Sequence, residues 1–202
     1  MVSLASLLLP ELMKNRSKTL REMATFATTH NFTLAVHGIG DKANSLVLET
    51  FAALDPPPLA GSSIEHAQLL SWSDLPLFKS LNLVASVQPE HLNDDKELAD
   101  RFWAGRTERA FAYQTLLDAG IPLVLGSDAP VAPLEPWGAM AAAISRERAG
   151  EEETGAWHPE QRISKLAAYE ASTGGRARIV VGDVADLCIT KVRRALYRWS
   201  PS

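Results

Sequence analysis

Four short apolar runs recur along this chain, separated by longer stretches whose apolar residues are spaced three and four apart. Runs of this length between polar segments are typical of buried strands in a parallel sheet. We predict these strands over Thr33–Val36, Ser62–Glu65, Leu83–Val87 and Pro122–Leu125. A fifth run, Val184–Thr190, predicts a last strand.

The longer stretches between the runs predict helices, with a polar loop or a broken helix over Asn93–Trp103. The helical ranges are Ser17–His30, Asp41–Leu54, Ser71–Leu81, Thr107–Ala119, Trp137–Arg148 and Glu160–Ala171. Asp41 and Ser71 are candidate N-terminal caps, and Gly120 is a candidate C-terminal cap. Strand and helix alternate four times, which indicates an α/β fold with a parallel sheet and crossover helices. A closed (β/α)8 barrel needs eight such units in about 250 residues, so we predict half of one.

Three of the predicted strands are followed by potential metal ligands. The strings LAVHGIGD, SIEHAQ and LVLGSDAP place His37, His66 and Asp128 where strands end. The carboxyl ends of parallel barrel strands surround the mouth where active sites lie. Two imidazoles and a carboxylate suit Zn²⁺ or a similar divalent ion. We therefore predict a divalent metal site, with zinc as the expected ion.

Each of these residues also has a purely structural interpretation. His37 precedes Gly38-Ile39-Gly40, so it is also consistent with a buried, hydrogen-bonded histidine beside a tight turn. His66 alone is equally consistent with a structural histidine. Asp128 can bind metal, act as a general base or do both, or it can cap a turn. Asp41 can orient an imidazole from outside the ligand set.

The third strand is followed by the string SVQPEH, which adds Gln88 and His91 to the same mouth. We predict that both contact the substrate and that His91 has a catalytic role, such as stabilising an oxyanion. The alternative for His91 is an ordinary surface loop. His30 and His158 have no comparable placement, and we expect them to be structural or exposed to solvent.

Composition narrows the class of protein. The chain has 202 residues, of which 46% are hydrophobic and 22% charged, as in a soluble globular domain. The net charge of -4 leaves no basic footprint for nucleic acid. A single cysteine, Cys188, fits a reducing compartment, and we expect a cytoplasmic protein. Pro10 and Glu11 interrupt the apolar start, and no stretch approaches the roughly 20 apolar residues of a membrane span.

Several longer strings together resemble the amidohydrolase superfamily, and more narrowly its amidohydrolase-3 family. They are HGIGDKAN, IEHAQLL, SVQPEHLNDD, RTERAFAYQTLLDAGIPLVLGSDAPVAPLEPW and WHPEQ, and the likeness runs from about Thr33 to Asp186. The resemblance implies a distorted (β/α)8 barrel beside a small β-sandwich. It implies that His37, His66 and Asp128 ligate the metal and that Asp128 transfers protons. The implied reaction is metal-assisted hydrolysis of a carbon–nitrogen, amide-type bond in a small molecule.

The resemblance also implies that the chain corresponds to the C-terminal half of the barrel. We expect residues 1–175 to form a partial barrel and residues 176–202 a remnant of the sandwich. The family's H-x-H pair after its first strand has no counterpart among the five histidines. Two functions therefore remain: a metal-dependent amidohydrolase or part of one, and a catalytically incomplete half-barrel that acts as an interaction module. Exposed strand edges predict a homo-oligomer or a complement to an N-terminal half.

Overall fold

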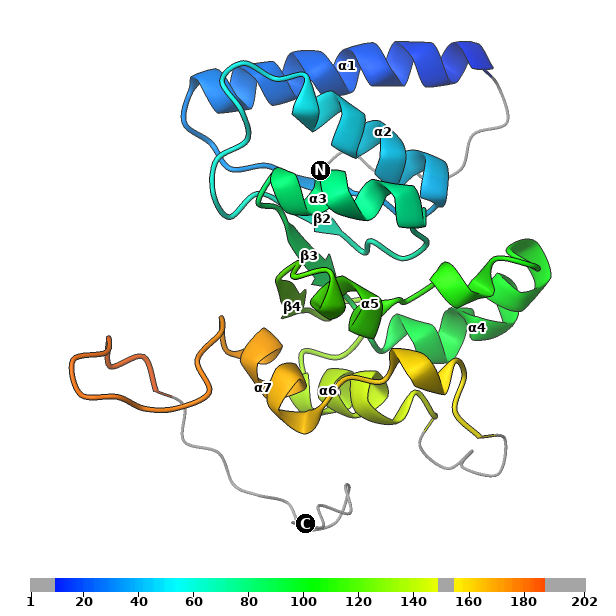
Figure 1. Ribbon diagram of the computed structural model, residues 1–202, viewed down its shortest axis with the longest axis vertical. Coiled ribbons are helices and arrows are strands. Elements are labelled where there is room, and N and C mark those ends of the chain that lie inside the picture. The colour runs from blue at the N-terminus through cyan, green and yellow to red at the C-terminus, as the bar shows by residue number, and fades with distance from the viewer. Residues whose placement is uncertain (1–9, 149–154, 188–202) are drawn as a thin grey trace.

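The computed structural model describes residues 10–148 and 155–187, with side chains from Ser17 onward. Its centre is one parallel sheet of four strands in the order β1-β2-β3-β4 (Figure 1). The strands are β1 (Ala35–His37), β2 (Ser63–Glu65), β3 (Val84–Val87) and β4 (Leu123–Leu125). The predicted α/β architecture with four parallel strands is confirmed, and each observed strand lies within or one residue beyond its predicted run.

Helices precede β1, cross over between consecutive strands and follow β4. They are α1 (Pro10–Thr29), α2 (Asp41–Ala52), α3 (Leu75–Ser80), α4 (His91–Phe102), α5 (Tyr113–Asp118), α6 (Pro136–Ser145) and α7 (Lys165–Ser172), with short 3₁₀ turns η1 (Trp72–Asp74), η2 (Thr107–Arg109) and η4 (Pro159–Gln161). Figure 1 shows them arranged along the sheet, from α1 and α2 at one end to α6 and α7 at the other. No helix among the described residues is long and apolar enough to cross a membrane.

The helices bury one face of the sheet. Register pairing aligns Val36, Ile64, Ala85 and Leu123 in one row across the four strands, and all four are buried. The next row aligns His37, Glu65, Ser86 and Val124, and all four are partly or largely exposed. Because successive strand residues point to opposite faces, the helices cover one face and leave the other open.

Two observed elements differ from their predictions because contacts with distant parts of the chain determine their structure. The polar segment expected as a loop or broken helix is the continuous helix α4, whose Leu92 and Ala99 are buried. The single helix expected over Thr107–Ala119 is divided into η2 and α5. Between them, the Phe111 amide donates to Gln68 O at 2.7 Å, and Leu69 and Ala110 form an antiparallel bridge. Pairing with the chain after β2 therefore interrupts the helix.

The other boundaries show smaller differences. The final predicted helix is divided into η4 and α7, with the Ser164 hydroxyl accepting from Ala167 N at the start of α7. Gly120 has φ +73, as expected for a helix C-terminal cap. The predicted strand Val184–Thr190 is wrong for residues 184–187, which form no strand, and its remainder lies outside the described residues. The predicted division at residue 175 remains a prediction.

Candidate metal centre

The predicted site residues gather at the carboxyl ends of the four strands. His37 is the last residue of β1, and His66 directly follows β2. Gln88 directly follows β3, and His91 is the first residue of α4. Asp128 follows β4 by three residues. Because the strands are parallel, all five side chains belong to the same edge of the sheet.

His37 and His66 are in direct contact. His37 Nδ1 lies 2.9 Å from His66 Nε2, and their ring centroids are 4.9 Å apart. The backbone at His66 is left-handed, with φ +71, and Ala67 follows with φ +43. Such conformations are costly for residues with a side chain and persist where the surroundings enforce them. The chain therefore turns sharply at His66, directly after β2.

A second group combines His66 with His91 and Asp128. One ligand atom from each lies within 4.8 Å of the other two. The His66 Nε2–Asp128 Oδ2 distance is 3.8 Å, and the rings of His66 and His91 are stacked with centroids 5.6 Å apart. The Nε2 atom of His91 is buried and has no hydrogen-bond partner among the described residues. This group contains His91 in place of His37, which joins the site through His66.

The electrostatic environment favours neutral His66. Burial lowers the pKa of His66 below its ordinary value of 6.5, and the neighbouring His37 and His91 lower that pKa further. Asp128 and Glu65 act in the opposite direction. A neutral imidazole has the free lone pair that metal coordination requires. Since burial is the largest cause, His66 is prepared for ligation by its position in the fold.

Gln88 adds an unpaired acceptor to the site. Its side chain is buried, and its Nε2 donates to Ser86 O at 3.2 Å. Its Oε1 is buried and has no hydrogen-bond partner among the described residues. A Cβ built on Gly126, just after β4, would lie 3.8 Å from Gln88 Nε2. Gln88 therefore lies between the ends of β3 and β4, with an oxygen available for a donor.

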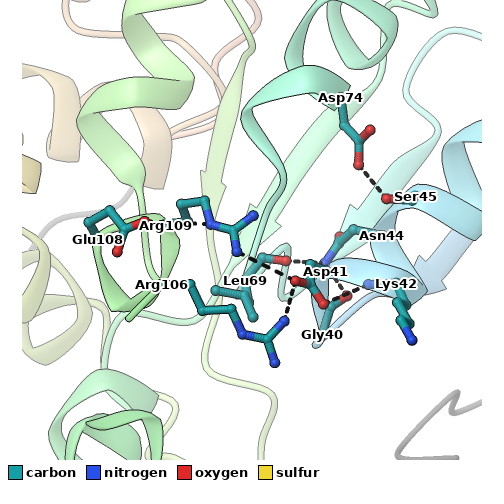
Figure 2. Close-up of polar contacts among 10 residues, drawn as sticks. All are labelled: Gly40, Asp41, Lys42, Asn44, Ser45, Leu69, Asp74, Arg106, Glu108 and Arg109. Carbon is teal, nitrogen blue, oxygen red and sulfur yellow. Dashed lines mark hydrogen bonds and ion pairs between the residues drawn. The ribbon is translucent and has the colours of Figure 1, made fainter. Parts of the chain in front are cut away.

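Asp41 was expected to cap a helix or to orient an imidazole, and its observed contacts differ from both expectations. Its carboxylate pairs with Arg106 and, at 3.6 Å, with Arg109, instead of orienting an imidazole (Figure 2). Gly40 is the N-cap of α2, and Asp41 begins the helix. The two guanidinium groups come from Arg109 of η2 and from Arg106, the residue just before η2. Asp41 thus connects α2 to a distant segment.

The most consequential residue that the sequence reasoning missed is Asn44. Its side chain is fully buried, and its amide donates to Gly38 O, directly after His37, and to Leu69 O, three residues after His66. A weak signal existed, because Asn44 precedes the buried Val47 and Leu48 by three and four residues. That spacing places Asn44 on the buried face of α2, where a polar side chain needs partners.

The two remaining histidines form other contacts. The Nδ1 atom of His30 lies 2.8 Å from Phe26 O on the exposed side of α1. The Nδ1 atom of His158 lies 3.0 Å from Glu160 Oε1. Both agree with the structural or solvent-facing role expected for them.

Sequence comparisons extend over most of the chain. The model of the amidohydrolase family matches residues 4–195. The protein LONG AFTER FAR-RED 3 of Arabidopsis thaliana is 38% identical over 150 residues, which are 72% of this chain and 25% of that protein. The putative amidohydrolase YtcJ of Bacillus subtilis (strain 168) is 27% identical over 164 residues, which are 81% of this chain and 31% of that protein. The chain thus spans about a quarter to a third of these relatives.

Solved structures support the same assignment. An uncharacterised metal-dependent hydrolase from Pyrococcus furiosus aligns with a TM-score of 0.66 and 27% identity, covering 79% of this chain and 31% of that one. Its counterpart from Pyrococcus horikoshii OT3 aligns with a TM-score of 0.66 and 25% identity, covering 77% and 31%. With a family match over nearly its whole length and the expected ligand types at the strand ends, this chain belongs to the amidohydrolase family.

Proposed function

We propose that this chain carries the metal centre of a metal-dependent amidohydrolase, which hydrolyses a carbon–nitrogen, amide-type bond in a small molecule. The observation that carries the proposal is the convergence on His66. Its Nε2 lies 2.9 Å from His37 Nδ1 and 3.8 Å from Asp128 Oδ2, at the mouth formed by the strand ends. Family membership supports the reaction class.

The donor set fits a divalent metal ion. His37, His66 and Asp128 would hold it, and two nitrogens with one carboxylate oxygen favour zinc. Two nitrogen ligands on one tetrahedral zinc ion stand about 3.3 Å apart, close to the observed separation of the two imidazoles. When bound, such an ion supplies Lewis-acid assistance and lowers the pKa of water.

The remaining chemistry belongs to side chains of this chain. Asp128 accepts a proton from the attacking water and passes it to the leaving nitrogen. The buried Nε2 of His91, which has no partner among the described residues, hydrogen-bonds the substrate at its reacting carbonyl. The unpaired Oε1 of Gln88 accepts from a substrate N–H.

Metal binding by the 202-residue chain tests the ligand assignment. Isothermal titration with Zn²⁺ and elemental analysis should give one tightly bound ion, and His37→Ala or Asp128→Ala should weaken binding at least tenfold. His30→Ala is the matched control because His30 bonds only the exposed side of α1 in the contacts described. Binding that is unchanged by His37→Ala and Asp128→Ala would overturn the assignment.

The variant His91→Ala distinguishes the two candidate ligand sets, one that contains His37 and one that contains His91. If His91 contacts substrate, His91→Ala should keep the Zn²⁺ affinity while lowering hydrolysis of chromogenic amides by the metal-loaded protein. Loss of Zn²⁺ with His91→Ala and retention with His37→Ala would instead assign the ligand role to His91.

A second candidate function, an oligomerising half-barrel module, is favoured by the open face of the sheet. Within the described sheet, β1 and β4 are edge strands, and the row that includes Glu65 and Val124 is not covered by a helix. Such edges and faces favour association with another chain. Light scattering after gel filtration should show a dimer or larger species, whereas a stable dilute monomer would contradict this candidate. The single cysteine supports a cytoplasmic location for either function.

A further inference from the structure

One buried side chain on α2 joins the loops that follow β1 and β2. Asn44 Nδ2 lies 2.9 Å from Gly38 O, 2.9 Å from Leu69 O and 3.0 Å from Gly40 O. Figure 2 draws the contacts with Gly40 and Leu69. Only the NH₂ end of an amide can donate, so the nitrogen faces these three carbonyls. Gly38 directly follows His37, and Leu69 lies three residues after His66.

Backbone hydrogen bonds align the same two loops. Gly38 N donates to Glu65 O at 2.9 Å, and Leu69 N donates to Ile39 O at 2.8 Å. The loop after His37 is therefore paired with the chain on both sides of His66. Asn44 donates at the centre of this pairing, where it satisfies carbonyls from both segments.

A charged contact holds the same helix end against a third segment. The carboxylate of Asp41 pairs with Arg106 and Arg109. Arg109 O in turn accepts from Leu70 N at 3.2 Å, immediately after the Leu69 carbonyl that Asn44 holds. The first turn of α2 thus contacts the loop after His66 directly through Asn44, and indirectly through the pair of Asp41 and Arg109 (Figure 2).

This fixation matters because the backbone at His66 is strained. His66 and Ala67 both have positive φ values, +71 and +43. A left-handed backbone is unfavourable for a residue with a side chain, so it relaxes when its supports are removed. Relaxation would rotate His66 away from His37, because the imidazole of His66 moves with that backbone.

We propose that Asn44 is a positioning residue that holds the imidazoles of His37 and His66 in their paired geometry, with Asp41 as its support. Asn44 acts through the carbonyls of Gly38 and Leu69 and does not touch a reacting atom. Its link to metal binding rests on the function proposed above. The geometry of the two imidazoles, however, is a property of the metal-free chain and is tested separately.

The first experiment observes the imidazoles without metal. Side-chain ¹⁵N NMR spectra of the full chain are recorded with Asn44→Ala and with Ser45→Ala. Ser45 is the matched control, because it is the next residue on α2 and its hydroxyl donates to Asp74 Oδ2 at 2.5 Å, away from both loops (Figure 2). Asn44→Ala should shift the His37 and His66 nitrogen signals, and Ser45→Ala should leave them in place. Unchanged signals in folded Asn44→Ala would overturn the proposal.

The second experiment uses Co²⁺ as a spectroscopic probe. Groups that support metal ligands typically contribute 10- to 100-fold to affinity, so Asn44→Ala should weaken Co²⁺ binding by about that factor and alter its visible absorption bands. Ser45→Ala should change neither. If the unaltered chain binds no Co²⁺, the proposed metal centre fails, while the metal-free NMR comparison still decides the role of Asn44.

A milder variant covers the case in which Asn44→Ala does not fold. Asp41→Asn removes the charge that faces Arg106 and Arg109 and leaves an oxygen for the Lys42 amide, which now bonds Asp41 Oδ1 at 3.0 Å. It should shift the same imidazole signals in the same direction by a smaller amount. A folded Asp41→Asn protein with unmoved His37 and His66 signals would contradict the proposal.

Discussion

Gly38 lies so close to Asn44 that a Cβ atom on Gly38 would stand 2.5 Å from Asn44 Oδ1. The same Cβ would stand 2.9 Å from Cγ2 of Ile64, a fully buried residue of β2. A side chain at the position after His37 would therefore force α2 or β2 to shift, because the two elements approach each other closely there. Asn44 Oδ1 is itself buried without a hydrogen-bond partner among the described residues.

Gly38→Ala should consequently destabilise the fold. Overpacking at a site closed on both sides costs about 1–3 kcal/mol, which urea denaturation followed by circular dichroism will measure. Gly40→Ala is the control for an added methyl group without overlap, since nothing lies within 4 Å of a Cβ at Gly40, whose φ is -83. It should cost less than Gly38→Ala, at most about 1 kcal/mol, because alanine is a poorer N-cap than glycine. Equal losses of stability in the two variants would mean that the close contact with Asn44 has no role.

The second prediction concerns pH and the pair Glu90 and Glu135. Burial, and then repulsion from Glu135, raise the pKa of Glu90 above its ordinary value of 4.5. Above pH 4.5 the folded carboxyl retains a proton that the unfolded one has lost, so this group's contribution to stability falls as pH rises through the folded pKa. Glu90→Gln should therefore stabilise the protein at pH 7 by about 0.5 kcal/mol, because partial exposure weakens the repulsion.

The difference between Glu90→Gln and the unaltered protein should disappear near pH 4, where the native carboxyl is protonated too. Thermal unfolding at a series of pH values will measure it. Glu97→Gln, an exposed change in the same helix α4, should be nearly neutral throughout. A loss of stability in Glu90→Gln that is independent of pH would contradict the prediction.

The third prediction concerns the buried guanidinium of Arg146. Its Nε donates to Trp157 O at 2.7 Å and its Nη1 to Phe111 O at 2.8 Å, and its Cζ lies 5.5 Å from the ring centroid of Tyr113. Arg146→Leu removes the donor to Trp157 O and one of two donors to Phe111 O, which also accepts from Tyr113 N at 2.9 Å. Unfolding should therefore become easier by about 3 kcal/mol.

Arg162→Leu is a matched control for this change. Arg162 also donates to a backbone carbonyl, Ser145 O at 2.9 Å, but its side chain is exposed. Chemical denaturation of the two variants should show a much larger loss for Arg146→Leu, since an exposed carbonyl is rehydrated by water. Similar losses would show that burial is not what makes Arg146 important.

The fourth prediction concerns ligand-induced stabilisation. If His37, His66 and Asp128 hold a divalent ion only in the folded state, Zn²⁺ at 100 times its dissociation constant should stabilise the protein by about 2.7 kcal/mol. Differential scanning fluorimetry should show a higher Tm with Zn²⁺ and a smaller change with Mg²⁺, which prefers oxygen ligands. The same rise in Tm for Asp128→Ala would contradict the assigned centre.

Local patterns in the sequence predicted much of the fold and the approximate position of the site. Short apolar runs identify all four strands because buried parallel strands have few polar positions. The parallel arrangement then places His37, His66 and Asp128 at one edge, since each follows such a run. These inferences depend on residues that are near one another in the chain, which is why a single sequence supports them.

Contacts between distant segments decided the rest. Leu92 and Ala99 are buried on α4 although the segment is polar, and pairing of Phe111 with Gln68 interrupts the expected helix before α5. His91 reaches His66 only because β2 and β3 are neighbours. The sequence alone thus determined which potential ligand follows each strand and which family the chain resembles. Only the tertiary structure decided that Asn44 holds two loops together, because hydrogen bonds across 25 residues depend on packing and leave no local pattern.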